Sequence, residues 1–486
     1  MSQSVEAHPL YRMINPRSIA FFGASNNFTS MGTIIFASFR ALGFEGPVYP
    51  VHPREQEVQG FRAYRDVAQL PEVPDLAVMV LPTGIVNQTL EACGRKGIRN
   101  VVIVSGGFKE VRGEGEDRER ELKEIAARYG IRVIGPNCLG VTNPHHRLNM
   151  TPFPYEGEPG FIGMASQSGS FVTQMFHYLH GLGLGFSTAV SVGNEADVDL
   201  VECIEYLGAC PNTKVVALYI EGIRRGSAFV EVTRRVAARK PIVAFYVGGS
   251  EAGRRAGSSH TGALAGPDEL YDGMFRQGCV IRAADLTELF DFCWVLGTLP
   301  TPEGPEVGLL TDSGGPGTAG ADACSRAGLR LPEFSERTVE KLRAHVPHTG
   351  SLGNPVDLTF HKNPKDFYTE IPKAILEDPY VQSLLVYFLM PVEFIERAMM
   401  HMGVPNEEIA GKIEGITKWQ GRAFADLMHT HGKPIVGYTW RGLEEPTIRT
   451  FMERGIPVFP GARRAARALA ALVRYGEIRK RLLPAV

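Results

Sequence analysis

The chain has 486 residues, of which 44% are hydrophobic and 21% are charged, as in ordinary globular proteins and unlike disordered chains. Its 51 basic and 53 acidic side chains give a net charge of −2, which argues against a broad nucleic-acid-binding surface. The length corresponds to roughly three domains and excludes a small disulfide-stapled scaffold.

The N-terminal third of the chain alternates short apolar runs with amphipathic stretches. Strands are predicted at 19–22, 48–51, 76–81, 101–104 and 132–134, with helices at 31–42 and 116–129. This βαβ alternation predicts a parallel sheet with helices on both faces.

Two further series of the same kind follow. Strands are predicted at 161–165, 187–192, 215–220, 242–246 and 280–282, and then at 307–311, 355–358, 383–388, 435–439 and 457–459. The stretches 143–160 and 298–305 are rich in Pro and Gly and are interpreted as linkers. The expected architecture is α/β with three domains, residues 1–145, 146–300 and 301–486, and a basic helix at 463–481 closes the third.

The chain carries no sign of export or membrane insertion. Seven cysteines without a CxxC pair argue against a disulfide framework and against a zinc site, and we predict no metal ligands in this chain. No run of about 18 apolar residues and no signal-peptide core are present. A cytoplasmic protein is expected.

Glycine is over-represented, with 54 residues, and several glycines follow predicted strands. Gly23 and Ser25 begin a turn that is similar to a nucleotide-binding turn but lacks a full GxGxxG motif, so a simple tight connection remains an alternative. The second strand ends in Val51 and is followed by Pro53 and Arg54, without the acidic residue that binds an NAD ribose. An NAD-dependent oxidoreductase is therefore disfavoured.

Two later turns at equivalent places of the second and third series form a weak internal repeat. A helix N-terminus with free N–H groups attracts anions, and small residues let a phosphate approach closely. The predicted phosphate-binding residues are Ser166, Ser168, Gly169, Ser170, Gly314 and Gly315.

His260 stands out among thirteen histidines because small residues flank it on both sides. A neutral imidazole near pH 7 is a nucleophile that can accept a phosphoryl group and release it again. Glu221, after the strand 215–220, is the candidate that orients the other ring nitrogen. A carboxylate that caps a helix remains the alternative for Glu221.

Eight motifs occur in one order along residues 12–475. They are Asn15-Pro16-Arg17-Ser18-Ile19-Ala20, Gly135-Pro136-Asn137-Cys138-Leu139-Gly140, Ser166-Gln167-Ser168-Gly169, Val192-Gly193-Asn194-Glu195-Ala196-Asp197, Tyr219-Ile220-Glu221-Gly222, Ser259-His260-Thr261-Gly262, Gly314-Gly315-Pro316-Gly317 and Asn354-Pro355-Val356-Asp357. In this set the chain resembles the α-type part of the NDP-forming, here ADP-forming, acyl-CoA synthetases, which are related to succinyl-CoA synthetase.

The resemblance implies a Rossmann-like CoA-binding domain followed by two flavodoxin-like, succinyl-CoA-ligase-type domains. It makes His260 the phosphorylated histidine, Glu221 its stabilising partner, and the two small-residue turns the phosphate site. The residues implied to bind CoA are Gly23, Ser25, Val51, Pro53, Arg54, Pro82, Thr83, Asn137 and Cys138.

One departure from the family pattern lies before the histidine. Family members usually have Lys-x-Gly-Arg there, whereas this chain has Tyr246, Val247, Gly248 and Gly249. Two positive charges are missing, so the resemblance leaves open how the histidine segment is anchored.

The resemblance implies a reversible ligase reaction, acid + CoA + ATP ⇌ acyl-CoA + ADP + phosphate. Three α/β series use up the sequence, so the ATP-grasp domain with its ADP or ATP and Mg²⁺ is expected on a β subunit, in a hetero-oligomer, although a homodimer is also open. A small carboxylic acid or its acyl-CoA is the expected substrate. The alternative is a stand-alone CoA- or acyl-CoA-binding protein with a regulatory or transferase role.

Overall fold

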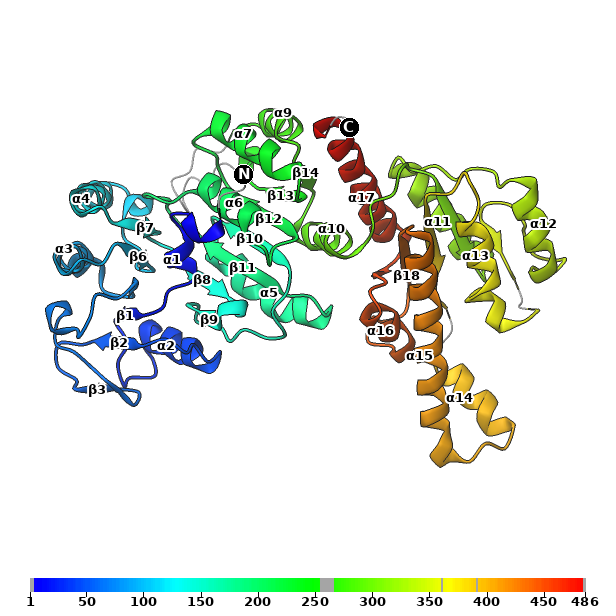
Figure 1. Ribbon diagram of the computed structural model, residues 1–486, viewed down its shortest axis with the longest axis horizontal. Helices are drawn as coiled ribbons and strands as arrows, with labels where there is room; N and C mark the ends of the chain where they lie inside the picture. Colours follow the sequence, from blue (N-terminus) through cyan, green and yellow to red (C-terminus); the bar gives the residue numbers. More distant parts are fainter. Residues whose placement is uncertain (1–3, 254–265, 360–361, 390–391, 484–486) are drawn as a thin grey trace. The chain divides into compact units, whose positions relative to one another are not determined.

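The computed structural model describes residues 4–253, 266–359, 362–389 and 392–483. The chain divides into two compact units, Met1–Leu289 and Phe290–Val486 (Figure 1). The dividing point lies inside helix α10 (Leu286–Thr298). Each unit is described by itself below.

The first sheet of unit 1 is a five-stranded parallel sheet. Its strand order is β2 (Val48–Val51), β1 (Ile19–Phe22), β5 (Leu76–Met79), β6 (Asn100–Ile103) and β7 (Arg132–Ile134). Its main helices are α2 (Met31–Ala41), α3 (Val86–Lys96) and α4 (Glu114–Tyr129). All residues of β1 and β5 are buried, as expected for parallel strands covered by helices on both faces. The predicted strands of this series are therefore confirmed to within two residues at each end.

The second sheet of unit 1 has seven strands. Its strand order is β14 (Ile281–Ala283), β13 (Ile242–Tyr246), β12 (Val215–Ile220), β10 (Ile162–Ser166), β11 (Phe186–Ser191), β8 (Gly140–Asn143) and β9 (Leu148–Asn149). The strands from β10 to β14 are parallel, and helices α5 (Gly169–Gly181), α6 (Leu200–Ala209), α7 (Gly226–Ala237) and α9 (Asp268–Gly278) accompany them.

The stretch 143–160 is not a linker throughout, and this part of the prediction is wrong. Strands β8 and β9 form an antiparallel hairpin, and β8 pairs antiparallel with β11 at the edge of the second sheet. A short 3₁₀ turn, Pro144–His146, joins the two short strands. Strands this short carry too little alternation for the sequence pattern to reveal them.

Unit 2 contains a five-stranded parallel sheet. Its strand order is β16 (Val356–Asp357), β15 (Val307–Thr311), β17 (Ser383–Tyr387), β18 (Ile435–Thr439) and β19 (Val458–Pro460). Its helices include α11 (Gly314–Arg326), α12 (Glu336–His345), α13 (Glu370–Leu376), α16 (Pro446–Glu453) and α17 (Ala462–Leu482). Helix α17 is the predicted basic helix. The expected α/β class with parallel sheets is confirmed in both units.

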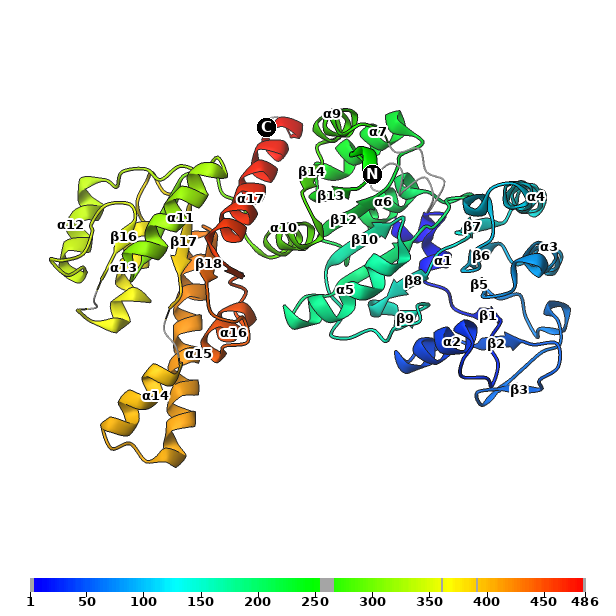
Figure 2. The ribbon, with the colours of Figure 1, turned by 180° about the vertical axis from the view of Figure 1, so that it is seen from behind.

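A pair of helices in unit 2 was not anticipated. Helix α14 (Val392–His401) and the 26-residue helix α15 (Asn406–His431) pack on each other around Met399, Ile409 and Ile413, a small cluster separate from the main core. Both views of the ribbon show this pair extending beyond the third sheet (Figures 1 and 2).

Among the residues that the structure describes, no helix combines the length and the apolar character needed to cross a bilayer.

Candidate functional site

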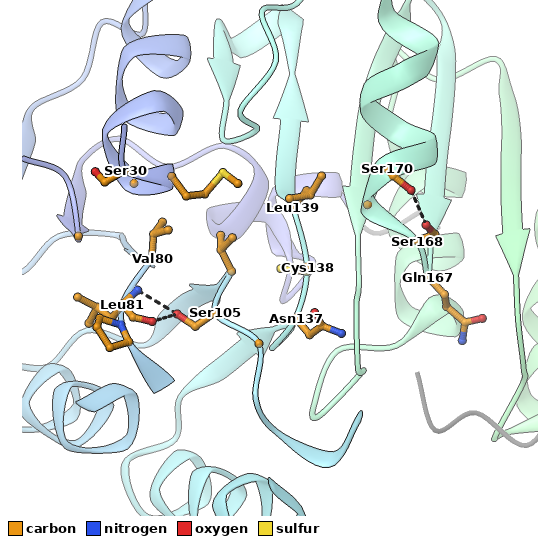
Figure 3. Close-up of a pocket in the computed structure, with 17 residues that line it drawn as sticks. Ser30, Val80, Leu81, Ser105, Asn137, Cys138, Leu139, Gln167, Ser168 and Ser170 are labelled. Carbon is orange, nitrogen blue, oxygen red and sulfur yellow. Dashed lines mark hydrogen bonds between the residues drawn. The ribbon is translucent and has the colours of Figure 1, made fainter. Parts of the chain in front are cut away.

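A cavity of about 650 Å³ lies in unit 1 where strand ends of both sheets converge (Figure 3). The turns that follow β1, β5, β6, β7 and β10 all contribute to its wall. The lining residues are Gly23, Ser30, Met31, Gly32, Val80, Leu81, Pro82, Val104, Ser105, Gly106, Asn137, Cys138, Leu139, Gln167, Ser168, Gly169 and Ser170. In open α/β sheets such a crevice outside the carboxyl ends of the strands is the usual ligand site.

The cavity brings together residues from both predicted groups. Four of the predicted CoA-binding residues line it, namely Gly23, Pro82, Asn137 and Cys138, and so do three predicted phosphate-binding residues, Ser168, Gly169 and Ser170. The two groups are far apart in the sequence. The fold therefore places a candidate CoA wall and a candidate phosphate wall around one space.

Other predicted residues do not line this cavity. Ser25 hydrogen-bonds Thr33 at 3.1 Å, Thr83 donates to the Gly106 carbonyl at 2.6 Å, and Ser166 is buried beneath the turn. Val51 is buried, whereas Pro53 and Arg54 are exposed after β2. Gly314 and Gly315 begin helix α11 of unit 2. His260 lies outside the described residues.

Two helices begin at this cavity without a side-chain cap. Ser30 precedes α2 and Ser168 precedes α5, and neither serine side chain accepts a capping hydrogen bond from a backbone N–H of its helix. Neither first turn carries an acidic residue. Uncapped N–H groups and the positive end of the helix dipole favour a phosphate or another anion here.

Close backbone packing accounts for the glycines in the walls. Gly23 has φ +97°, and a Cβ there would lie 1.9 Å from the Val80 carbonyl oxygen. A Cβ on Gly169 would lie 2.5 Å from Cγ of Leu139, itself a lining residue. Larger residues would therefore displace the walls of the cavity at both positions.

Cys138 contributes its backbone rather than a reactive thiol. Its side chain is buried, and Sγ donates to the Ile103 carbonyl at 3.3 Å. Burial raises the pKa of the thiol to about 12, so the thiolate is not populated near neutral pH.

Glu221 follows β12 and is buried beside the cavity wall rather than in it. Its backbone N–H donates to Oε1 of Gln167 at 2.6 Å, and Gln167 lines the cavity. Burial, and then the nearby charge of Glu221, raise the pKa of the Tyr219 hydroxyl, which keeps that phenol neutral. The backbone of Glu221 is thus tied to the phosphate wall through Gln167.

Tyr246 occupies the place where the resemblance predicts a lysine. Its ring stacks on Tyr271 with centroids 3.6 Å apart and planes at 12°, and its hydroxyl donates to the Gly266 carbonyl at 2.7 Å. Gly266 is the first described residue after 254–265, the stretch that contains His260. The Tyr246 hydroxyl thus fixes the Gly266 carbonyl, directly after that stretch, while the neutral Tyr246 ring packs on Tyr271.

The sequence reasoning assigned no role to several lining residues. Ser105 follows β6 as Pro82 follows β5, and its hydroxyl both accepts from the Leu81 N–H at 2.9 Å and donates to the Leu81 carbonyl at 2.7 Å (Figure 3). The rule that strand ends line the crevice could have found it. Gln167 was part of a quoted motif, but the backbone groups of Glu221 and Gly222 that its side chain binds lie more than 50 residues away.

Comparisons with family models divide the chain into three matching regions. Residues 17–144 match a CoA binding domain, residues 159–296 a succinyl-CoA ligase like flavodoxin domain, and residues 307–417 a ligase-CoA domain. The first two regions contain every residue that lines the cavity.

Named relatives match almost the whole chain. It is 38% identical over 464 residues to the acetate–CoA ligase [ADP-forming] II subunit alpha of Pyrococcus furiosus, covering 95% of this chain and 97% of that protein. It is 36% identical to the acetate–CoA ligase [ADP-forming] I of Archaeoglobus fulgidus, over 96% of this chain but only 64% of that longer protein.

A solved structure has the same fold along its length. This is the dinucleotide forming acetyl-coenzyme A synthetase 1 of Ca. Korarchaeum cryptofilum in complex with phosphate and ADP. The TM-score is 0.86 and the identity 32%, covering 98% of this chain and 99% of that one.

Proposed function

The chain belongs to the family of ADP-forming acyl-CoA ligases, and from this premise we propose that it performs the acyl and phosphoryl transfer steps of such an enzyme as its α subunit. The reaction is acid + CoA + ATP ⇌ acyl-CoA + ADP + phosphate. The observation that carries the proposal is the shared cavity, because CoA-side turns and a phosphate-side helix start face one space.

In the direction that consumes acyl-CoA, an oxygen of inorganic phosphate attacks the thioester carbonyl. The carbon–sulfur bond breaks, CoA leaves, and an acyl phosphate remains. The uncapped N-terminus of α5 at Gly169 neutralises charge on the phosphoryl oxygens as the bonds change. Ser168 and Ser170, whose hydroxyls lie 3.0 Å apart, supply further hydrogen bonds to them.

His260 then accepts the phosphoryl group from the acyl phosphate, and the acid leaves as its carboxylate. Glu221 accepts a hydrogen bond from the other ring nitrogen and stabilises the charged phosphohistidine. Gly314 and Gly315, at the uncapped start of α11 in unit 2, form a second helix end suited to bind an anion.

The nucleotide step belongs to a partner. Phosphohistidine transfers its phosphoryl group to ADP on an ATP-grasp β subunit, and Mg²⁺ bound with the nucleotide offsets the phosphate charge there. Two observations support a partner of this kind. One relative is named as a subunit alpha of nearly this length, and another is a longer single chain.

The substrate is a small carboxylic acid, and acetate is the acid in the names of the relatives described above. Acetyl-CoA is therefore the probe of choice. Within the described residues, His, Cys, Asp and Glu side chains form no group of three or more suited to a metal ion.

The test is phosphate incorporation into the full chain. The chain is incubated with acetyl-CoA, labelled phosphate and Mg²⁺, in parallel with His260→Ala. We expect acid-labile label on the wild-type chain and none on the alanine variant. A wild-type chain that binds CoA but takes up no label would instead support the stand-alone CoA-binding protein.

A further inference from the structure

The side-chain amide of Asn194 lies between two carboxyl groups. Asn194 comes shortly after β11 and is buried. Its Nδ2 donates to Oε2 of Glu110 at 2.6 Å and to Oε2 of Glu119 at 3.2 Å, so both hydrogen atoms of the amide nitrogen are used. The amide is thereby held with its nitrogen toward these two side chains and its oxygen away from them.

Glu110 is itself held in place as an acceptor. Its Oε1 accepts from the N–H groups of Gly107 at 2.5 Å and Phe108 at 3.2 Å, and its Oε2 also accepts from Phe108 at 3.2 Å. Since both oxygens of Glu110 face donors, the group that Asn194 turns toward them has to be a donor as well. The turn after β6 therefore determines the direction of the Asn194 amide.

The orientation of Asn194 determines that of Asn137. The Oδ1 atom of Asn194 accepts from Nδ2 of Asn137 at 3.3 Å. The backbone of Asn137 is fixed, because its N–H donates to the Ser105 carbonyl at 2.9 Å. Only the amide of Asn137 can turn, and the bond to Asn194 requires that its nitrogen faces Asn194.

The oxygen of Asn137 is then left for the cavity. Asn137 lines the cavity, and so does Gly106. A Cβ on Gly106 would lie 3.2 Å from Oδ1 of Asn137, so this oxygen lies at the cavity wall. The hydrogen bond to Asn194 uses the nitrogen of the amide and leaves the oxygen as an acceptor for a donor on a ligand.

The place of Asn137 in the cavity indicates which part of CoA it meets. Figure 3 shows Asn137 between Ser30 and Leu81 on one side and Ser168 and Ser170 on the other. In the proposed reaction the thioester has to reach the phosphate wall at Ser168 and Ser170. The nucleotide end of CoA then lies on the opposite side, and the pantetheine arm, which carries two amide N–H groups, passes Asn137.

We propose that Asn194 is a positioning residue for CoA, which holds the amide of Asn137 so that its oxygen accepts a hydrogen bond from an amide N–H of the pantetheine arm. The inference rests on the proposed function, because that function supplies CoA as the ligand of the cavity. Asn194 is absent from the cavity lining and acts through Asn137.

The experiment compares full-length chains with Asn194→Ala, with Asn137→Ala and with both changes. The control is Asn87→Ala on α3. The amide of Asn87 likewise donates to a carboxylate of α4, Oε2 of Glu121 at 2.6 Å, but Asn87 does not line the cavity. Thermal unfolding shows whether each chain is folded at the temperature of the assay.

The readouts are the Kd for CoA and the Kd for 3′-phospho-ADP, the nucleotide half of CoA without the pantetheine arm. We expect Asn194→Ala to weaken CoA binding about fivefold, the factor that one hydrogen bond contributes on average, and Asn137→Ala at least as much. The Kd for 3′-phospho-ADP stays within about twofold of wild type in both variants. Asn87→Ala binds both ligands as wild type does.

An isosteric change tests the orientation itself. In Glu110→Gln the new side-chain oxygen accepts from Gly107 and Phe108, so the new nitrogen faces Nδ2 of Asn194 and two donors meet. The Asn194 amide is then no longer held with its oxygen toward Asn137. We expect Glu110→Gln to weaken CoA binding by about the same factor as Asn194→Ala, although the size and shape of the side chain stay the same.

The double variant separates positioning from a general structural effect. Because Asn194 acts through Asn137, the double variant should bind CoA no more than about twofold more weakly than Asn137→Ala alone. Single losses that multiply in the double variant would overturn the positioning role. An equal loss of 3′-phospho-ADP binding would overturn it too, since the whole CoA site would then be disturbed.

The outcome for wild type distinguishes this inference from the proposed function. If the wild-type chain binds no CoA, the proposed function fails. If it binds CoA, and folded Asn194→Ala and Glu110→Gln bind CoA equally well, the positioning role alone is wrong.

Discussion

The turn after β10 in unit 1 and the turn after β15 in unit 2 follow the same hydrogen-bond scheme. The hydroxyl of Ser166 donates to the Ser168 carbonyl at 2.6 Å and accepts the Ser168 N–H at 3.2 Å. The hydroxyl of Thr311 does the same with Ser313, at 2.8 and 3.1 Å. The weak repeat seen in the sequence is thus a repeat of local geometry, and each turn leads into an uncapped helix.

The two turns differ in the residue at their centre. Gln167 is a neutral amide whose bonds orient the backbone at Glu221. Asp312 is a carboxyl group whose pKa is raised to about 6, mainly by burial and further by Asp357. The two turns therefore share their backbone geometry but differ in electrostatics. The side chain at the centre of the first turn is uncharged at any pH, whereas the charge of Asp312 in the second turn changes near pH 6.

The largest expected effect concerns the one strongly shifted carboxyl group beside the first turn. Burial raises the pKa of Glu195 from 4.5 to about 7, and the charged or titratable groups that interact with it are Asp199, Arg225, Cys203 and Tyr271. Between these pH values the folded chain holds a proton that the unfolded chain has lost. The free energy of unfolding therefore falls by about 3 kcal/mol from this group as pH rises from 4.5 to 7.

The substitution Glu195→Gln removes this pH-dependent contribution to the free energy of unfolding. In urea-induced unfolding at pH 5 and pH 7, we expect the difference between wild type and variant to change by about 2 kcal/mol, in favour of the variant at the higher pH. A difference that is the same at both pH values would mean that Glu195 does not titrate in this range.

A somewhat smaller effect of the same sign belongs to the second turn. The pKa of Asp312 is raised from 3.8 to about 6, so its contribution to the free energy of unfolding is lost as pH rises between those values. Because the side chain retains some exposure, the expected loss is about 2 kcal/mol. Asp312→Asn removes it.

The control for this prediction is Asp322→Asn, on helix α11 that follows the turn, where the carboxylate is exposed and pairs with Arg326. Urea unfolding at pH 4 and pH 6 should show a pH-dependent gain for Asp312→Asn and none for Asp322→Asn. If the two variants behaved alike, Asp312 would not have a raised pKa, and the proposed electrostatic difference between the two turns would be wrong.

The glycines of the two turns provide a steric comparison. A Cβ on Gly169 would lie 2.5 Å from Leu139, whereas a Cβ on Gly315 would meet nothing within 4 Å. We expect Gly169→Ala to lower the free energy of unfolding by about 1–2 kcal/mol, and Gly315→Ala to change it by less than about 0.5 kcal/mol. If Gly169→Ala and Gly315→Ala had equal effects in thermal unfolding, the side chain of Leu139 would be able to move away from the new methyl group at no cost in stability.

The smallest effect concerns the anchor of the histidine segment. Tyr246→Phe keeps the stack on Tyr271 and removes the hydrogen bond to Gly266. We expect a loss of about 1 kcal/mol or less in urea unfolding. Tyr380→Phe, at an exposed tyrosine, is the control. No difference between the two would mean that the hydrogen bond to Gly266 contributes nothing measurable to stability.

Much of the architecture followed from the sequence because buried parallel strands are nearly continuous apolar runs that end in small residues. Such runs placed Gly23 and Ser168 at strand ends, and strand ends of parallel sheets converge. Local patterns could not reveal the roles of Gln167 and Glu195, since their partners at Gly222 and Leu200 meet them only after folding.

Other features were missed for related reasons. The helix α14 buries only a small apolar cluster, so its pattern did not stand out against a loop. The anchor formed by Tyr246 depends on contacts with Tyr271 and Gly266, more than 15 residues away in the chain. The family pattern showed that a lysine is missing before the histidine. It could not show which contacts Tyr246 makes in its place.

Locating the phosphoryl group on the labelled chain tests the central claim most directly. After incubation with acetyl-CoA and phosphate, the chain is digested under neutral conditions and the phosphorylated peptide is identified by mass spectrometry. The account predicts a single phosphoryl group on His260, with none on Ser168 or Ser170. A phosphoryl group on either serine, or label that persists in His260→Ala, would contradict it.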